Sequence, residues 1–255
     1  MKTLGAIATP MIFIALLLAI WEGVCRATGV PAYLLPPPSA IWASLLAGWP
    51  LLLGSAWNTL TTALVALAVS SLIACALALV TALSPLVERA VRPLAVTLQV
   101  TPVIAIAPLL IIWAGLDHPE RAVVIAAAVV AFFPIFSGAV TGLKSAEPDL
   151  ERLFDLYGAS RWQKLWKLRL PSAVPYLLEG HKVAAGLAVI GAVMGEFVAG
   201  SGGSQGLAWR ILEAGNRLQT ARMFAALVVL AVMAALLHAL LQVAERRALV
   251  WWRGR

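Results

Sequence analysis

Residues 58–83 read NTLTTALVALAVSSLIACALALVTAL and contain no charged side chain. They lie within an uncharged stretch of 61 residues between Arg26 and Glu88. A helix of ~20 residues, at a rise of ~1.5 Å per residue, crosses the ~30 Å hydrocarbon core of a bilayer. Because a water-exposed surface does not tolerate so long an uncharged run, the stretch predicts a membrane-spanning helix.

The rest of the chain repeats this pattern. Uncharged windows of 19, 24, 22 and 22 residues follow Lys2, Arg92, Arg121 and Arg222, and 62% of all residues are hydrophobic against 12% charged. This composition excludes a disordered or nucleic-acid-binding chain. We expect an all-α polytopic membrane protein forming one domain over residues 1–255. Its six membrane-spanning helices are expected in the first stretch up to Trp21 and near 58–83, 93–113, 121–143, 175–198 and 222–244.

Two segments in the first half of the chain each allow two interpretations. The apolar run up to Trp21 is longer than the core of a usual signal peptide and has no small-residue cleavage site after it, which favours a retained helix over a cleaved leader. Downstream, Pro36-Pro37-Pro38 precedes a segment with apolar residues and two tryptophans. That segment fits either a short helix at the membrane interface or a simple loop.

Lysine and arginine are distributed unevenly between the two sides of the expected bundle. Fourteen of the 19 fall in the termini and connectors of one side. Because positively charged connectors stay in the cytoplasm, we expect both termini to be cytoplasmic. The same rule explains the net charge of +7 without a nucleic-acid partner. The five residues of the outer side are Arg26, Arg121, Arg210, Arg217 and Arg222.

The longest cytoplasmic connector, about residues 145–174, predicts two short helices that meet at an elbow. Pro148 suits a first helical turn, and Gly158 is a candidate C-terminal cap for a helix with an apolar stripe. Ser160 and Gln163 make a capping box that begins a second helix, which Pro171 and Pro175 are expected to stop. The stripe consists of Leu150, Leu153, Phe154 and Tyr157.

Two interpretations of this elbow remain. An interfacial amphipathic hairpin, with its tryptophans among lipid headgroups, accounts for the composition. A docking elbow also accounts for the tight tip, because a glycine and small residues there permit close approach by another protein. The residues that we expect to make this contact are Leu153, Phe154, Tyr157, Gly158, Ala159, Ser160 and Arg161.

The elbow carries a resemblance to a known family. Gly158, followed after nine residues by Leu168-Arg169-Leu170-Pro171, resembles the cytoplasmic signature of permease subunits of bacterial binding-protein-dependent ABC importers. Arg152-Leu153-Phe154 stands where that signature has Glu-Ala-Ala, so a contact made by the family's acidic residue is in doubt here. The continuation Pro175-Tyr176-Leu177-Leu178-Glu179-Gly180 is similar to the nitrate, sulfonate, taurine and thiamine-precursor group.

The resemblance implies a fold and a set of partners. The fold is that of a type I ABC importer permease with six spans, working as two copies with two ATPase subunits inside and a substrate-binding protein outside. The elbow would be the coupling helix, and the solute a thiamine-precursor pyrimidine, riboflavin or a sulfonate. The chain itself would not be an enzyme, since Gly142-Leu143-Lys144-Ser145 lacks the order of a phosphate-binding loop and ATP with its magnesium belongs to the partner subunit.

The cysteines and histidines give little evidence of a further functional site. Cys25 and Cys75 indicate no disulfide framework, and the three histidines, one of which is His238, have no metal-ligand spacing. We therefore expect no catalytic residue, cofactor or metal in this chain. The main alternative is an ion-coupled carrier or channel without an ATPase. It would need charged groups deep in the spans, where almost none occur apart from Glu196 and His238 near span ends.

The translocation path is expected to involve the third and fifth spans. Gln99 and Thr101 place polar groups beside Pro102, and unpaired polar groups facing lipid are costly. Glu196, near the outer end of the fifth span, either reaches water or faces the path or a partner helix. The small residues Gly191 and Gly195 in that span fit close packing within one chain as well as a helix that lines the path. We expect Gln99, Thr101 and Glu196 on surfaces of the path.

Overall fold

The computed structural model describes residues 2–115, 117–200 and 205–252, and over these ranges the regular structure is entirely helical. Met1 and Arg255, the two ends of the chain that we expect in the cytoplasm, lie outside the described residues. The first half contains α1 (Lys2–Thr28), α2 (Pro38–Ala47), α3 (Trp49–Leu83), α4 (Pro85–Val100), α5 (Val103–Ala114) and α6 (Pro119–Leu143). The second half contains α7 (Pro148–Leu156), α8 (Arg161–Lys164), a π-helix η1 (Leu165–Arg169), α9 (Leu170–Ala199), α10 (Leu207–Asn216) and α11 (Thr220–Trp252).

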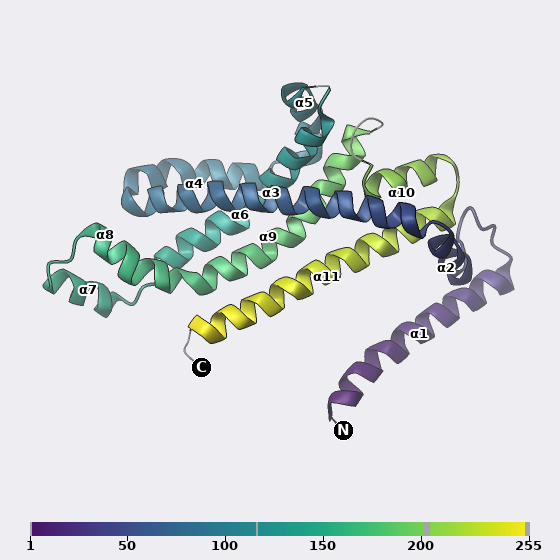
Figure 1. Ribbon diagram of the computed structural model, residues 1–255, viewed down its shortest axis with the longest axis horizontal. Helices are drawn as coiled ribbons and strands as arrows, with labels where there is room; N and C mark the ends of the chain where they lie inside the picture. Colours follow the sequence, from purple (N-terminus) through teal and green to yellow (C-terminus); the bar gives the residue numbers. More distant parts are fainter. Residues whose placement is uncertain (1, 116, 201–204, 253–255) are drawn as a thin grey trace.

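The long helices lie along one axis and define two ends of the molecule (Figure 1). The helices α7 and α8 form one end, which we call the elbow end. The short helices α2 and α10 lie at the opposite end, where α3 and α11 begin. The helix α1 runs apart from the other long helices in this view.

Within the described residues, five helices are long and apolar enough to cross a membrane, and six spans result if the bent pair α4 and α5 is counted as one. We expected one continuous helix near residues 93–113. This expectation is wrong, because α4 and α5 meet at a bend of 103° at Thr101 and Pro102. Pro102 lacks a backbone N–H and disfavours the helical conformation of the residue before it. Thr101 accordingly adopts an extended conformation, with φ −72° and ψ 122°.

The segment after the three prolines is a helix, α2, and not a simple loop. Ile41 and Leu45 are buried on one face of it, whereas Trp42 and Leu46 are exposed on the other. Its apolar exposed face is of the kind that lies at a membrane interface.

The second helix of the elbow does not stop at Pro171, contrary to the expectation. Residues Arg161–Ala199 follow one continuous helical path, with the π-helix η1 directly before the proline. In this turn the N–H of Leu170 donates to the carbonyl of Leu165, five residues back. The wider π-helical turn makes room for the ring of Pro171, which would otherwise clash with the preceding turn of the helix. The elbow is therefore joined rigidly to the fifth span.

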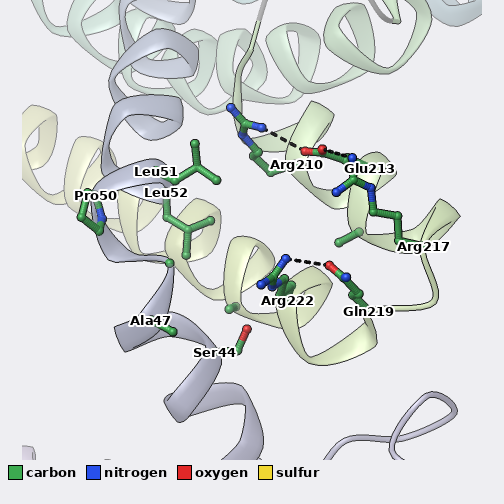
Figure 2. Close-up of a pocket in the computed structure, with 13 residues that line it drawn as sticks. Ser44, Ala47, Pro50, Leu51, Leu52, Arg210, Glu213, Arg217, Gln219 and Arg222 are labelled. Atoms are coloured by element: carbon green, nitrogen blue, oxygen red, sulfur yellow. Dashed lines mark hydrogen bonds and ion pairs between the residues drawn. The ribbon is translucent and has the colours of Figure 1, made fainter.

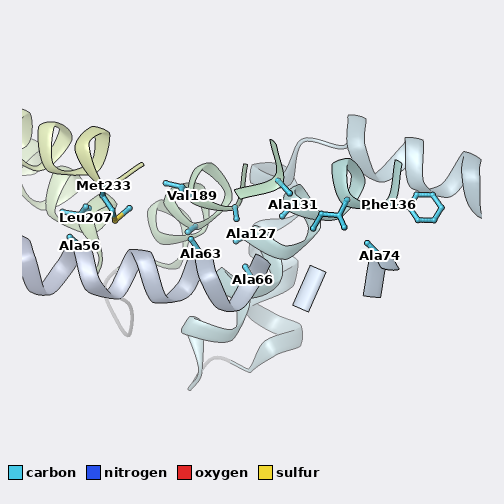
Figure 3. Close-up of a cluster of buried hydrophobic side chains, with 14 of the residues drawn as sticks. Ala56, Ala63, Ala66, Ala74, Ala127, Ala131, Phe136, Val189, Leu207 and Met233 are labelled. Carbon is cyan, nitrogen blue, oxygen red and sulfur yellow. The ribbon is translucent and has the colours of Figure 1, made fainter. Parts of the chain in front are cut away.

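The core lies between α3, α6 and α9 and is built largely of alanine (Figure 3). Ala66, Ala74, Ala127, Ala131 and Ala192 have no exposed surface. Side chains of this size let helix backbones approach closely, and that packing stabilises helix pairs in a membrane where lipid tails remove the hydrophobic driving force.

The helices α6 and α9 approach each other closely, for example at Gly191 and Gly195. A Cβ atom added to Gly191 would lie 2.6 Å from the Cα of Ala127, and one added to Gly195 would lie 2.9 Å from the Cα of Val123. Real Cβ atoms do not come so near a backbone atom, so both positions require glycine. The two glycines serve packing within this chain.

A buried polar network ties the outer end of α9 to α3 and α10. The carboxyl group of Glu196, which has no exposed surface, accepts hydrogen bonds from Thr59 Oγ1 at 2.8 Å and from the N–H of Ala208 at 3.0 Å. Thr59 Oγ1 in turn accepts from the N–H of Leu207 at 2.9 Å. Helix α10 thus begins on a carboxyl group, which helix N-termini favour.

The glycine contact leads to a stability prediction with an internal control. Gly191→Val should lower the free energy of unfolding of the purified chain by about 1–3 kcal/mol more than Gly186→Val does, since overpacking a close helix contact costs this much. Both changes have the same effect on helix propensity, and a Cβ atom added to Gly186 would meet no neighbouring atom within 4 Å. Equal losses in a denaturant titration in detergent would contradict the packing account.

Candidate functional site

The tip of the elbow is a well-defined turn around Gly158. This residue has φ +69°, the left-handed conformation expected of it. Its N–H donates to the carbonyl of Asp155 at 2.9 Å, and the N–H of Ala159 donates to that of Phe154 at 2.9 Å. These two bonds make a Schellman motif, which satisfies carbonyls at the end of α7.

The second arm begins with the expected capping box. The N–H of Gln163 donates to Ser160 Oγ, and the N–H of Ser160 donates to Gln163 Oε1. An ion pair between Lys164 and Asp155 then joins the two arms. Together with the turn, these contacts fix the angle at which the tip is presented.

A further ion pair connects the first arm to the π-helix. Arg169 Nε donates to Glu151 Oε1 at 2.8 Å, with both side chains about one-third exposed. Arg152, at the place where the family signature has glutamate, is exposed and pairs with Asp149 at 3.3 Å. An acidic residue is therefore present one position earlier, and it binds α7 to the start of the fifth span.

The residues expected at the docking surface lie together at this tip and are mostly exposed. The exposed fraction is 44% for Leu153 and 83% for Tyr157, and Leu156 between them is 85% exposed. A shallow pocket at the tip is lined by Leu153, Phe154, Tyr157, Ala159, Gln163 and Lys167. Gly158, Ser160 and Arg161 are exposed beside it. An apolar surface this large at a rigid turn suits burial against another protein.

A second candidate site is a groove at the break between α4 and α5, which we call the hinge groove. Gln99 and Thr101, two of the residues expected on the translocation path, line it. The hydroxyl of Thr101 donates to the carbonyl of Thr97 at 2.7 Å, whereas the amide of Gln99 is exposed. The other lining residues are apolar: Leu98, Pro102, Val103, Ile104, Val129, Val130, Phe133, Pro134, Leu187 and Met194.

One face of α9 contributes to this groove and remains uncovered beyond it. Val183, Ile190 and Met194 are 46%, 51% and 38% exposed, and Gly186 and Leu187 lie between them on the same helical face. The spacing of these residues by three, four and seven places them in one stripe. The third and fifth spans therefore do meet, as the sequence predicted.

Glu196 does not lie in the hinge groove. It follows Met194 by two residues, which is about 200° around a helix, and its side chain points into the contact with α3 and α10. The expectation that Glu196 occupies an accessible surface of this chain, solvated or on the path, is corrected here. Of the alternatives considered for it, the structure selects the contact with neighbouring helices.

Sequence reasoning missed the apolar part of the hinge groove. Phe133, Leu187 and Met194 carry no local signal, because an apolar residue in a span can either pack against another helix or face lipid. The signal that was present is the stripe on α9 from Val183 to Met194. Its small member, Gly186, falls on the uncovered face, whereas Gly191 and Gly195 fall on the packed one.

Comparisons with known proteins show which family the chain belongs to. The family described as the binding-protein-dependent transport system inner membrane component matches residues 70–250. The formylaminopyrimidine transport permease protein ThiX of Halalkalibacterium halodurans is 33% identical over 95% of each chain. The riboflavin transport system permease protein RibX of Chloroflexus aurantiacus is 34% identical over 92% of this chain and 87% of that protein.

A solved structure of the MetNI methionine ABC transporter, in an inward-facing conformation, shares the fold. Its TM-score is 0.69 at 20% identity, and the match covers 79% of this chain and 97% of that one. This likeness concerns the fold alone, whereas the family match and the relatives cover most or nearly all of the chain. The chain therefore belongs to the binding-protein-dependent transport system inner membrane components, the permease subunits of ABC importers.

Proposed function

We propose that two copies of this chain form the translocation path of an importer that is driven by two separate ATPase subunits and supplied by an external binding protein. The observation that carries this proposal is the continuous helical path from Arg161 to Ala199, which joins the elbow to the hinge groove. Movement at the elbow would be transmitted along α9 without a flexible joint. ATP and magnesium belong to the partner subunit in this account, and the elbow faces the cytoplasm with both termini.

The apolar tip of the elbow supports docking on an ATPase. Leu153, Phe154 and Tyr157 would be buried in the contact, with Gly158, Ala159 and Ser160 allowing close backbone approach. Arg161 lies at the rim, where its charge can meet an acidic side chain or a lipid headgroup. The exposed fractions of Leu153 and Tyr157 leave this surface open for a partner.

The uncovered stripe of α9 supports pairing of two copies around a central path. The hinge groove of each copy would line this path, with the exposed Gln99 amide as a polar contact for the solute. Among the described lining residues there is no lysine or arginine to hold an anion. The amide, the Thr101 hydroxyl and the ring of Phe133 suit an uncharged heteroaromatic solute. This chemistry favours a pyrimidine or flavin over a sulfonate or nitrate, in line with the names of the two relatives.

The rival function, an ion-coupled carrier or channel, receives little support from the buried charges. Glu196 is the one fully buried ionisable side chain among the described residues with assigned burial. It binds neutral donors of α3 and α10 and lies away from the hinge groove. A coupling ion in the groove would meet no carboxylate there.

The function predicts a stable complex with an ATPase. A tagged chain expressed with its neighbouring genes should bring down an ATPase subunit, and uptake into proteoliposomes should require both ATP and the binding protein. Tyr157→Asp, which places a charge at the apolar tip, should reduce recovery of the ATPase. Arg26→Asp, at the opposite end of the molecule, is the matched control. Uptake driven by an ion gradient without any ATPase would favour the carrier.

The path predicts a pattern of thiol accessibility. In a variant without Cys25 and Cys75, Gln99→Cys and Met194→Cys should react with a membrane-impermeant thiol reagent, at rates that change during ATP turnover. Ala188→Cys, on the packed face of α9 and 1% exposed, should remain unreactive. Reaction of Gln99→Cys and Met194→Cys with lipid-soluble reagents alone would place these residues on the lipid face and contradict the path.

A further inference from the structure

A pocket at the end of the molecule opposite the elbow is lined by three arginines and one carboxylate (Figure 2). It lies between α2, the start of α3, α10 and the start of α11. Arg210, Arg217 and Arg222 line it together with Glu213, which leaves an excess of two positive charges. We call it the arginine pocket. The transport route proposed above does not use it.

Two of the arginines share the carboxylate. Arg210 Nη1 lies 2.9 Å and Arg217 Nη2 lies 3.0 Å from the oxygens of Glu213. Arg210 is further fixed by hydrogen bonds to Ser55 Oγ at 3.0 Å and to Gln205 Oε1 at 3.1 Å. It therefore forms a rigid wall, whereas the Arg217 side chain is 62% exposed and keeps donors free for a ligand.

The third arginine has no counter-charge. Arg222 Nη1 donates to Gln219 Oε1 at 2.9 Å, and no carboxylate within the described ranges pairs with it. Figure 2 shows it across the pocket from Arg217. Guanidinium groups placed in this way match the oxygens of a phosphate.

An apolar groove lies between α3 and α11, two of the helices that line the arginine pocket. It is lined on α3 by Trp49, Leu53, Gly54, Ala56, Trp57, Leu60 and Leu64, and on α11 by Val229, Val232, Met233, Leu236, Leu237 and Leu240. On α11, Arg222 and Ala225 of the pocket share one helical face with Val229 and Val232 of the groove, so the two cavities follow one another along this helix. We call this second part the acyl groove.

The dimensions and surroundings fit a lipid. From Val229 to Leu240 the acyl groove follows α11 for roughly 16 Å at ~1.5 Å per residue, close to half of a ~30 Å hydrocarbon core. At the same end of the molecule as the arginine pocket, Trp42 in α2 and Trp49 at the start of α3 are 63% and 47% exposed. Exposed tryptophans mark the depth of lipid headgroups. We propose that this combined site binds one anionic phospholipid, with its phosphate in the arginine pocket and an acyl chain in the acyl groove.

The test compares lipids on the purified full-length chain by native mass spectrometry and titration. Phosphatidylglycerol should bind more tightly than phosphatidylcholine with the same acyl chains. Arg217→Gln and Arg222→Gln should each weaken phosphatidylglycerol binding about fivefold, the effect of one basic residue beside an anionic lipid. Arg222→Lys should retain most of it. Arg121→Gln, an exposed arginine at the start of α6 and outside the pocket, should leave it unchanged.

Further arms separate a lipid from other occupants. Leu236→Trp fills the acyl groove and should weaken both lipids, whereas Leu72→Trp, on an exposed part of α3 outside the groove, should not. Inorganic phosphate at millimolar concentration should not displace phosphatidylglycerol. The proposal is overturned if both arginine variants keep the wild-type affinity. It is also overturned if phosphate displaces the lipid and Leu236→Trp has no effect, because that result indicates a site for a free anion. Cysteine cross-linking that places α1 of a second copy in the acyl groove would overturn it as well.

Discussion

Backbone contact between α6 and α9 constrains the rest of the structure. Gly191 and Gly195 let α9 approach the backbone of Ala127 and Val123, and no larger residue fits at either position. In a bilayer, where apolar side chains gain little by leaving lipid, such contact is a main source of helix association. It fixes the rotation of α9, and with it the direction of every other residue on that helix.

Two consequences follow from this rotation. On one side of α9, Glu196 reaches Thr59 and the start of α10, which closes the end of the bundle away from the elbow. On the other side, Val183, Ile190 and Met194 stay uncovered beside the hinge groove. The elbow joins the same helix through the π-helix before Pro171, and the pair of Glu151 with Arg169 holds its first arm. A displacement of the tip therefore acts on the helix that lines the groove.

The features that could be predicted from the sequence are those with a local cause. The left-handed Gly158 and the capping box of Ser160 and Gln163 depend on a few neighbouring residues, and the structure confirms them. The uncharged windows located the spans, because a helix that crosses a bilayer must be long enough and carry few charged side chains. The break at Pro102 was predictable as a weak point, but its angle of 103° depends on how α5 packs against α6 and α9.

Other features depend on residues far apart in the chain, which no local pattern brings together. Thr59 lies 137 positions from Glu196, so the network that buries this glutamate could not be read from either segment. Pro171 normally ends a helix, and only the structure shows the wider turn that lets the helix continue. The spacing of Gly191 and Gly195 fitted two interpretations, and the positions of Ala127 and Val123 decided between them.

The central claim is that the geometry of the elbow tip links ATP hydrolysis to solute uptake. The most direct test is the number of ATP molecules hydrolysed per solute imported, measured in proteoliposomes with the ATPase and the binding protein, for Gly158→Val and Gly158→Asn. Valine resists the left-handed conformation at φ +69° by about 1–2 kcal/mol, whereas asparagine adopts it more readily. We expect the ratio to rise for the valine variant and to stay near the wild-type value for asparagine. A valine variant that assembles normally, is stimulated by the binding protein and keeps the wild-type ratio would contradict the account.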